Sequence, residues 1–102
     1  MPTYTPPLRD QQFVINELLG AATQYKQMPR HHEVDADVLN HVLEEAGKFC
    51  AEVLLPLNQT GDEEGCTYDP KTREVRTPKG FREAYDRFRA AHWQGLGITE
   101  GA

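Results

Sequence analysis

The chain has 102 residues, of which 38% are hydrophobic, 26% charged and 9% aromatic. That length suffices for one small domain, and such a domain buries only about 60–65% of the surface that its unfolded chain exposes. Eleven basic and sixteen acidic residues leave a net charge of −5. This charge argues against nucleic acid or an anionic membrane as a partner, because both require an excess of positive charge. The length also argues against a self-contained enzyme that encloses a large cofactor.

Charge is unevenly distributed along the chain. Residues 1–32 carry a net charge of +1, residues 33–64 carry −8 and residues 65–102 carry +2. We interpret the acidic middle segment as the solvated face of an amphipathic helix. The alternative interpretation is a docking surface for a basic partner.

Targeting signals and a disulfide framework are both missing from the sequence pattern. The N-terminus has neither a basic region nor an apolar run of a secretory signal, and no apolar stretch is long enough to span a membrane. The two cysteines, Cys50 and Cys66, are too few for a disulfide scaffold. We therefore expect a cytoplasmic protein with reduced thiols.

The first third of the chain predicts an arm followed by short helices. Prolines at positions 2, 6 and 7 indicate an extended arm over residues 1–9. The remaining residues, 10–102, are expected to form a single, partial helical domain. Asp10 is expected to cap a short helix that ends near Gly20, and one or two more helical turns precede a loop over residues 28–32.

The strongest periodic signal predicts a long amphipathic helix that begins after Asp35 or Asp37. Its apolar residues recur at i, i+3, i+4 and i+7 steps, at positions 38, 39, 42, 43, 46, 49, 50, 53, 54 and 57. Pro56 falls inside this pattern and predicts a kink or a break, because proline removes an amide donor and crowds the preceding turn. We expect the helix to continue through residues 58–64 and to end at Gly65.

The last third of the chain predicts a hairpin and one more helix. Residues 66–68 and 74–76 flank a turn-forming sequence and are expected to pair as two short strands. Thr77 and Pro78 resemble the N-cap and first position of a helix. That helix is expected to carry its apolar residues on one face, namely Phe81, Ala84, Tyr85, Phe88, Ala91 and His92.

The predicted fold class is mostly α: an open bundle of about three amphipathic helices, one long and kinked near Pro56, with a small β-hairpin. The apolar arc of the long helix is broader than one neighbouring helix would cover. We therefore expect a homo-oligomer that pairs through exposed apolar helix faces, with the long helix over residues 36–57 as the contact.

Histidines and carboxylates form only weak candidates for a metal site. His41 and Glu45 lie four residues apart on the long helix, but a closed site needs about four ligands and no second matching pair exists. An ordinary exposed helix face is the alternative that we favour. The sequence His31-His32-Glu33 is interpreted as a solvated loop.

Candidate nucleophiles and binding loops are equally weak. Cys50 occupies an apolar position of the long helix, and no basic residue flanks either cysteine to stabilise a thiolate. Serine is absent from the chain, which excludes serine-based catalysis. The acidic residues 62–64 lack the alternating ligands of a calcium loop, and the glycines at 95 and 97 lack the context of a phosphate loop. We assign no catalytic, cofactor-binding or metal-binding residue.

Seven segments of the chain match one protein family in order. They lie at residues 4–10, 13–20, 42–49, 53–58, 62–66, 77–85 and 93–96. Together they resemble the N-terminal part of a bacterial acyl-CoA dehydrogenase subfamily that carries an N-terminal extension, and the resemblance runs from about residue 4 to residue 97.

The resemblance implies FAD-dependent oxidation of an acyl-CoA to a 2-enoyl-CoA, in which a carboxylate takes the α-proton and the flavin accepts the β-hydride. The subfamily includes enzymes for fatty acyl-CoAs and for a sulfur-containing short acyl-CoA. The catalytic glutamate, the flavin-binding strands and most of the acyl pocket are implied to lie beyond Ala102. FAD and acyl-CoA are therefore expected in the intact enzyme, and neither is expected on this chain.

Two functional hypotheses follow. In the first, the chain is a structural helical segment of an acyl-CoA dehydrogenase and is inactive alone. In the alternative, it is a stand-alone helical interaction or dimerisation protein without catalysis. A small metal-binding protein built on His41 and Glu45 is a third hypothesis.

Overall fold

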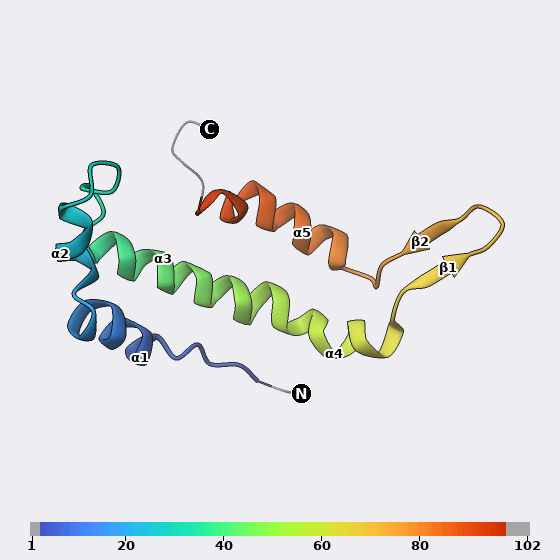
Figure 1. Cartoon of the computed structure of the whole chain (residues 1–102). Coiled ribbons are helices and arrows are strands. Elements are labelled where there is room, and N and C mark those ends of the chain that lie inside the picture. The colour runs from blue at the N-terminus through green and yellow to red at the C-terminus, as the bar shows by residue number, and fades with distance from the viewer. Residues whose placement is uncertain (1–2, 98–102) are drawn as a thin grey trace. The chain divides into compact units, whose positions relative to one another are not determined.

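The computed structural model describes residues 3–97, which are mostly helical (Figure 1). The chain divides into two compact units, Met1–Glu52 and Val53–Ala102. The first two residues of the predicted arm and the last five residues of the predicted domain lie outside the described residues. Within residues 3–97, no helix has the length and apolar character that crossing a membrane would require.

The first unit begins with short helical segments. These are the α-helix α1 (Leu8–Gln12), the π-helix η1 (Phe13–Leu18) and the α-helix α2 (Ala21–Lys26). The expectation that Asp10 caps the first helix is wrong. Helix α1 begins at Leu8 with Pro7 as its N-cap, and the carbonyl of Pro7 accepts from the amide of Gln11 at 3.0 Å. Pro7 lies outside the helical conformation, with a ψ of 61°, and at the N-cap its missing amide proton costs no helical hydrogen bond.

Helix α3 (Ala36–Phe49) begins where the sequence predicts. The Asp35 side chain accepts a hydrogen bond from the Val38 amide at 2.9 Å, which satisfies one of the unpaired donors of the first turn. The loop predicted over residues 28–32 is confirmed as a series of turns between α2 and α3. Asn16 of η1 donates to the side chain of Asn40 on α3 at 2.9 Å.

A glycine lets the N-terminal arm lie close to helix α3. A Cβ atom built at Gly47 would lie 3.0 Å from Cβ and Cγ of Pro6 and 3.5 Å from a methyl group of Leu8. This spacing leaves no room for a larger side chain unless the arm shifts. The first unit is therefore held together by an arm and short helices packed along one side of α3.

The sequence predicts a kink or a break near Pro56, and the structure shows a change of helix type just ahead of it without an interruption. The segment η2 (Cys50–Leu54) is a π-helix, and α4 (Leu55–Glu64) follows it without a loop. Proline has no amide proton for the carbonyl four residues earlier, and a wider turn accommodates that loss. The polar residues 58–64 do continue the helix, and Gly65 ends it with a φ of 66°.

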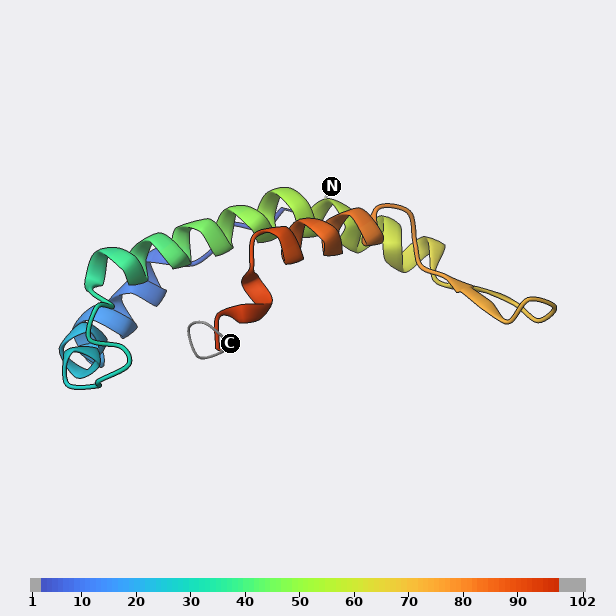
Figure 2. The same ribbon diagram turned by 90° about the horizontal axis from the view of Figure 1, so that it is seen from above.

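The predicted hairpin is confirmed. Strands β1 (Thr67–Asp69) and β2 (Glu74–Arg76) pair antiparallel, with Tyr68 opposite Val75. The Asp69 carboxylate accepts from the amide of Lys71 at 2.9 Å and so stabilises the turn. In both ribbon views the hairpin extends away from helices α4 and α5 (Phe81–Ala90) (Figure 1, Figure 2).

The expected start of the last helix at Thr77 and Pro78 is wrong. Helix α5 begins at Phe81, because the chain first makes a turn in which the amide of Phe81 donates to the carbonyl of Pro78 at 3.2 Å. Gly80 adopts a φ of 89°, a left-handed conformation that favours glycine. A short 3-10 helix, η3 (Trp93–Gly95), follows α5.

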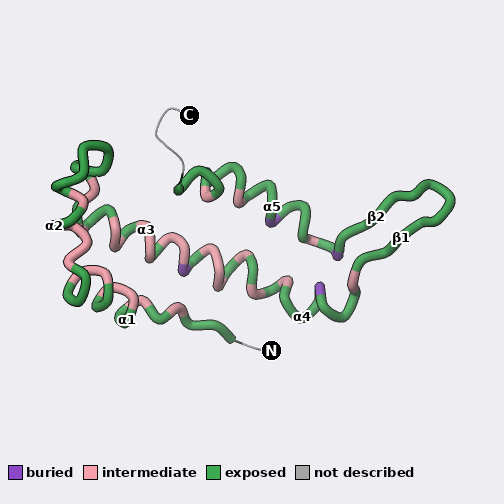
Figure 3. The backbone as a smooth tube through the Cα atoms, viewed as in Figure 1, coloured by how far each residue is buried: buried purple, intermediate pink, exposed green. Residues whose placement is uncertain are grey.

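Hardly any apolar side chain is enclosed. Among the described residues, Ala84 is the one buried hydrophobic residue of the core. Figure 3 shows most of the chain as exposed or intermediate. Large apolar side chains on α3, α4 and α5 are exposed or half-buried. Each unit therefore leaves apolar faces on its own helices that the other described residues of the same unit do not cover.

The Asp35 cap is testable in the 102-residue chain. We expect Asp35→Ala to cost about 1 kcal/mol of helix stability, because the Val38 amide loses its acceptor. Hydrogen exchange of that amide, followed by NMR, should accelerate. Asp35→Asn should behave like the parent chain, since asparagine caps equally well.

Asp37→Ala is the matched control, because Asp37 lies in the first turn and only Asp35 caps the helix. Equal exchange rates at Val38 in the Asp35→Ala and Asp37→Ala variants would contradict the assigned cap.

Candidate functional site

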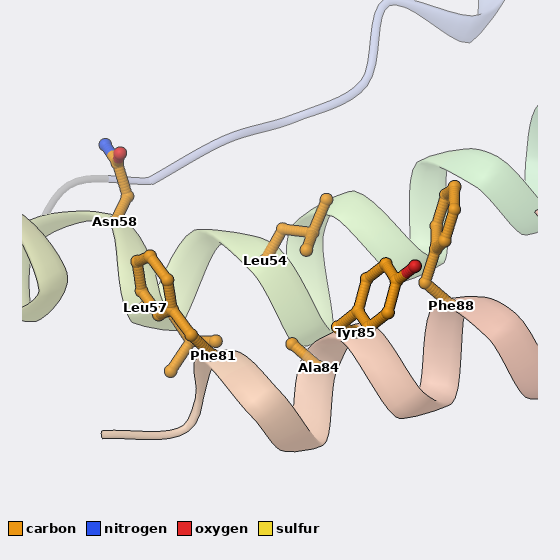
Figure 4. A pocket seen from close by; sticks show the side chains of 7 residues that line it. All are labelled: Leu54, Leu57, Asn58, Phe81, Ala84, Tyr85 and Phe88. Carbon is orange, nitrogen blue, oxygen red and sulfur yellow. The ribbon is translucent and has the colours of Figure 1, made fainter. Parts of the chain in front are cut away.

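The second unit contains an apolar groove of about 400 Å³ between α4 and α5. Its lining side chains come from the end of η2, the first turn of α4 and one face of α5 (Figure 4). They are Leu54, Leu57, Asn58, Phe81, Ala84, Tyr85 and Phe88. Asn58 contributes the one amide group of this lining.

Two glycines bring the helices close enough to form this groove. A Cβ atom built at Gly61 would lie 2.5 Å from Cε1 and Cζ of Phe81, which is well inside van der Waals contact. A Cβ atom at Gly80 would lie 2.7 Å from a methyl group of Leu57. The Glu64 carboxylate also accepts a hydrogen bond from the amide of Lys79 and ties the end of α4 to the turn before α5.

The open side of the groove carries exposed apolar groups. Tyr85 is 60% exposed, Leu54 43% and Phe81 38%. The Tyr85 ring stacks on Phe88 with a centroid separation of 6.4 Å, and the guanidinium carbon of Arg89 lies 5.8 Å from the Tyr85 ring centroid. The groove can therefore bury an apolar group, with a cation–π pair at its rim.

The groove lining carries one ionisable side chain, the phenol of Tyr85. No carboxylate, imidazole or thiol lines the groove beside it to act as a partner in acid–base or covalent catalysis. The arrangement supports binding or packing.

The residues weighed as metal ligands are not brought together. His41 is exposed on α3, and the carboxylate of Glu45 lies 3.5 Å from the ammonium of Lys48. His32 contacts the carbonyl of Pro29 at 2.9 Å within the loop. Across residues 3–97, no group of three or more metal-ligating side chains is close enough to hold an ion.

The other candidates have local structural roles. Cys50 is half-buried in η2, Cys66 is exposed, and both are free thiols. In the acidic run at residues 62–64, Glu63 accepts from the Gln59 side chain at 3.2 Å.

The sequence predicts the side of the groove that α5 forms, but it does not predict that residues of η2 and α4 form the opposite side. The apolar face of α5 was predicted from its periodicity. Leu54 and Leu57 were assigned only to the stripe of the long helix, and their contact with α5 was not predicted. The signal that could have located it is the pair Gly61 and Gly80, one on each side of the hairpin.

Comparison with known proteins gives two matches that cover nearly the whole chain. The chain is 37% identical over 94 residues to 3-methylmercaptopropionyl-CoA dehydrogenase of Ruegeria pomeroyi, which covers 92% of this chain. It is 28% identical over 100 residues to the broad-specificity linear acyl-CoA dehydrogenase FadE5 of Mycobacterium tuberculosis, which covers 98% of this chain. The resemblance to the acyl-CoA dehydrogenases is confirmed.

The chain spans only 16% of the length of each of these relatives. No family model matches the chain. The similarity to acyl-CoA dehydrogenases therefore rests on these pairwise matches, which concern a small part of each relative.

The close approach at Gly61 is testable. We expect Gly61→Ala to lower the free energy of unfolding. At a separation of 2.5 Å, overpacking against the Phe81 ring should cost about 2–3 kcal/mol, the upper part of the usual range, and should exceed the gain of about 1 kcal/mol in helix propensity. Urea unfolding followed by circular dichroism measures the difference.

Gln59→Ala on the same helix is the control, because Gln59 is exposed and lies outside the groove lining. A Gly61→Ala variant that is as stable as the parent chain or more stable would contradict the close packing of α4 against α5.

Proposed function

We propose that the chain is an N-terminal helical segment of an FAD-dependent acyl-CoA dehydrogenase and acts structurally within the intact enzyme. The observation that carries this proposal is the pair of matches over 92% and 98% of the chain to dehydrogenases of which it spans 16%. The proposed activity of the whole protein is oxidation of an acyl-CoA to a 2-enoyl-CoA. A cytoplasmic location is part of the same proposal.

The uncovered apolar faces support a structural role. Val38 on α3, Leu54 ahead of α4 and Tyr85 on α5 are all exposed. Large exposed apolar patches on a protein mark surfaces that another element covers. A segment cut from a larger fold would present such faces.

The lining of the groove does not fit FAD. The pyrophosphate of FAD requires backbone amides of a glycine-rich loop or basic side chains, and the groove lining offers one amide side chain, Asn58. The proposal therefore places FAD and acyl-CoA in the rest of the enzyme. This chain contributes packing surface only.

A chimaera tests the proposal. The matched 94-residue segment of the Ruegeria pomeroyi dehydrogenase is replaced by the corresponding residues of this chain. We expect the chimaera to fold, to retain bound flavin and to oxidise 3-methylmercaptopropionyl-CoA. The 102-residue chain alone should neither bind flavin nor oxidise this substrate.

A chimaera whose matched segment is replaced by a flexible glycine–serine linker is the control, and it should lose flavin. Acyl-CoA oxidation by the 102-residue chain supplied with FAD would contradict the proposal. So would a linker chimaera that performs as well as the one carrying this chain.

The second candidate function is a stand-alone interaction protein that forms a homo-oligomer through the long helix over residues 36–57. The observation that favours it is the exposure of Val38 and Leu54 within that stretch. In this proposal no catalysis is required, and a second chain covers the apolar faces.

A further inference from the structure

We propose that the groove between α4 and α5 is a self-docking surface, on which the free chain binds the same face of a second copy. Arg82 of each copy lies opposite Asp62 of the other in this pairing. The inference goes beyond the structural role within an enzyme, because it concerns the chain without the rest of a dehydrogenase. It assigns the contact to specific residues of the second unit.

The open face of the groove supplies the apolar part of the contact. Leu54, Phe81 and Tyr85 are exposed there, and the groove floor is formed by the buried Ala84. A small residue between larger ones leaves a hollow into which a protruding ring can fit. Burying these side chains removes apolar surface from water, which is the main driving force for association.

The α5 rim of the groove is basic. Arg82 precedes Tyr85 by three residues and Arg89 follows it by four, so helical periodicity places both on the Tyr85 side of α5. Arg89 lies over the Tyr85 ring and also forms an ion pair with Asp86 at 4.0 Å. Arg82 is exposed, and none of the ion pairs among residues 3–97 includes it.

The α4 rim is acidic. Asn58 lines the groove, and Asp62 lies one helical turn further along the same side of α4. Asp62 is exposed, and it too takes part in none of the ion pairs of the described residues. One rim therefore offers an unpaired cation and the other an unpaired anion.

The antiparallel course of the helices makes this face self-complementary. Residue numbers increase in opposite directions along α4 and α5, as the labelled side chains of the groove show (Figure 4). Gly61 packs against Phe81, so the neighbouring Asp62 and Arg82 lie at the same end of the groove on opposite rims. A two-fold axis running along the groove places the Arg82 rim of one copy over the Asp62 rim of the other. Two-fold symmetry then forms the same ion pair twice.

Charge reversal tests the pairing in the 102-residue chain. The parent chain should form a dimer in sedimentation equilibrium over a concentration series. Arg82→Glu and Asp62→Arg should each weaken dimerisation about tenfold, because each change places like charges together at two symmetric positions. The double variant Arg82→Glu/Asp62→Arg should restore the dimer.

Two controls separate this surface from others. Lys71→Glu makes the same charge change in the exposed hairpin turn and should leave the dimer intact. Val38→Glu alters the apolar face of α3, which the second candidate function uses, and should also leave it intact. Circular dichroism of every variant confirms that helix content is retained.

An isotope-filtered NOE experiment on the parent chain avoids any dependence on variants. It should show contacts between the Tyr85 ring of one copy and the Leu54 methyl groups of the other. A monomer at high concentration, or a dimer without these contacts, would overturn the proposal. Loss of the dimer in Val38→Glu but not in Arg82→Glu would overturn it as well. None of these results affects the chimaera experiment, so the structural role would stand or fall separately.

Discussion

The close approach of α4 and α5 at Gly61 and Gly80 is the contact on which the second unit depends. A hairpin with every residue exposed cannot hold two helices together by itself, because two short strands are marginally stable in water. The glycines allow the Phe81 ring and the Leu57 side chain to reach the opposing backbone. That contact buries Ala84 and forms the groove.

Local signals in the sequence were sufficient to predict most of the elements. Periodicity located α3, Asp35 marked its start, and Pro56 marked the change to a π-helix ahead of α4. Both errors in helix starts occurred next to prolines, at Pro7 and Pro78. A proline fits more than one position around a helix start, so the choice depends on neighbouring contacts that a local pattern does not contain.

The groove could not be predicted, because it depends on which turn of α4 faces α5. Periodicity identifies an apolar face of a helix but not the element that packs on it. The apolar stripe of the long helix is broad enough to contact more than one neighbouring helix. Gly61 lies in a polar segment that the sequence presents as an ordinary helix end. Its role becomes visible only when the Phe81 ring is seen against it.

The proposal that this chain is one segment of a larger fold accounts for two observations. Hardly any apolar side chain is buried, and the chain matches only a small part of two dehydrogenases. Hydrogen–deuterium exchange of α5 amides tests this account most directly. The exchange rates are compared between the dilute 102-residue chain and the chimaeric dehydrogenase that carries it. The account predicts much slower exchange of α5 in the chimaera, where other helices cover its apolar face. Equal exchange rates in the two proteins would contradict it.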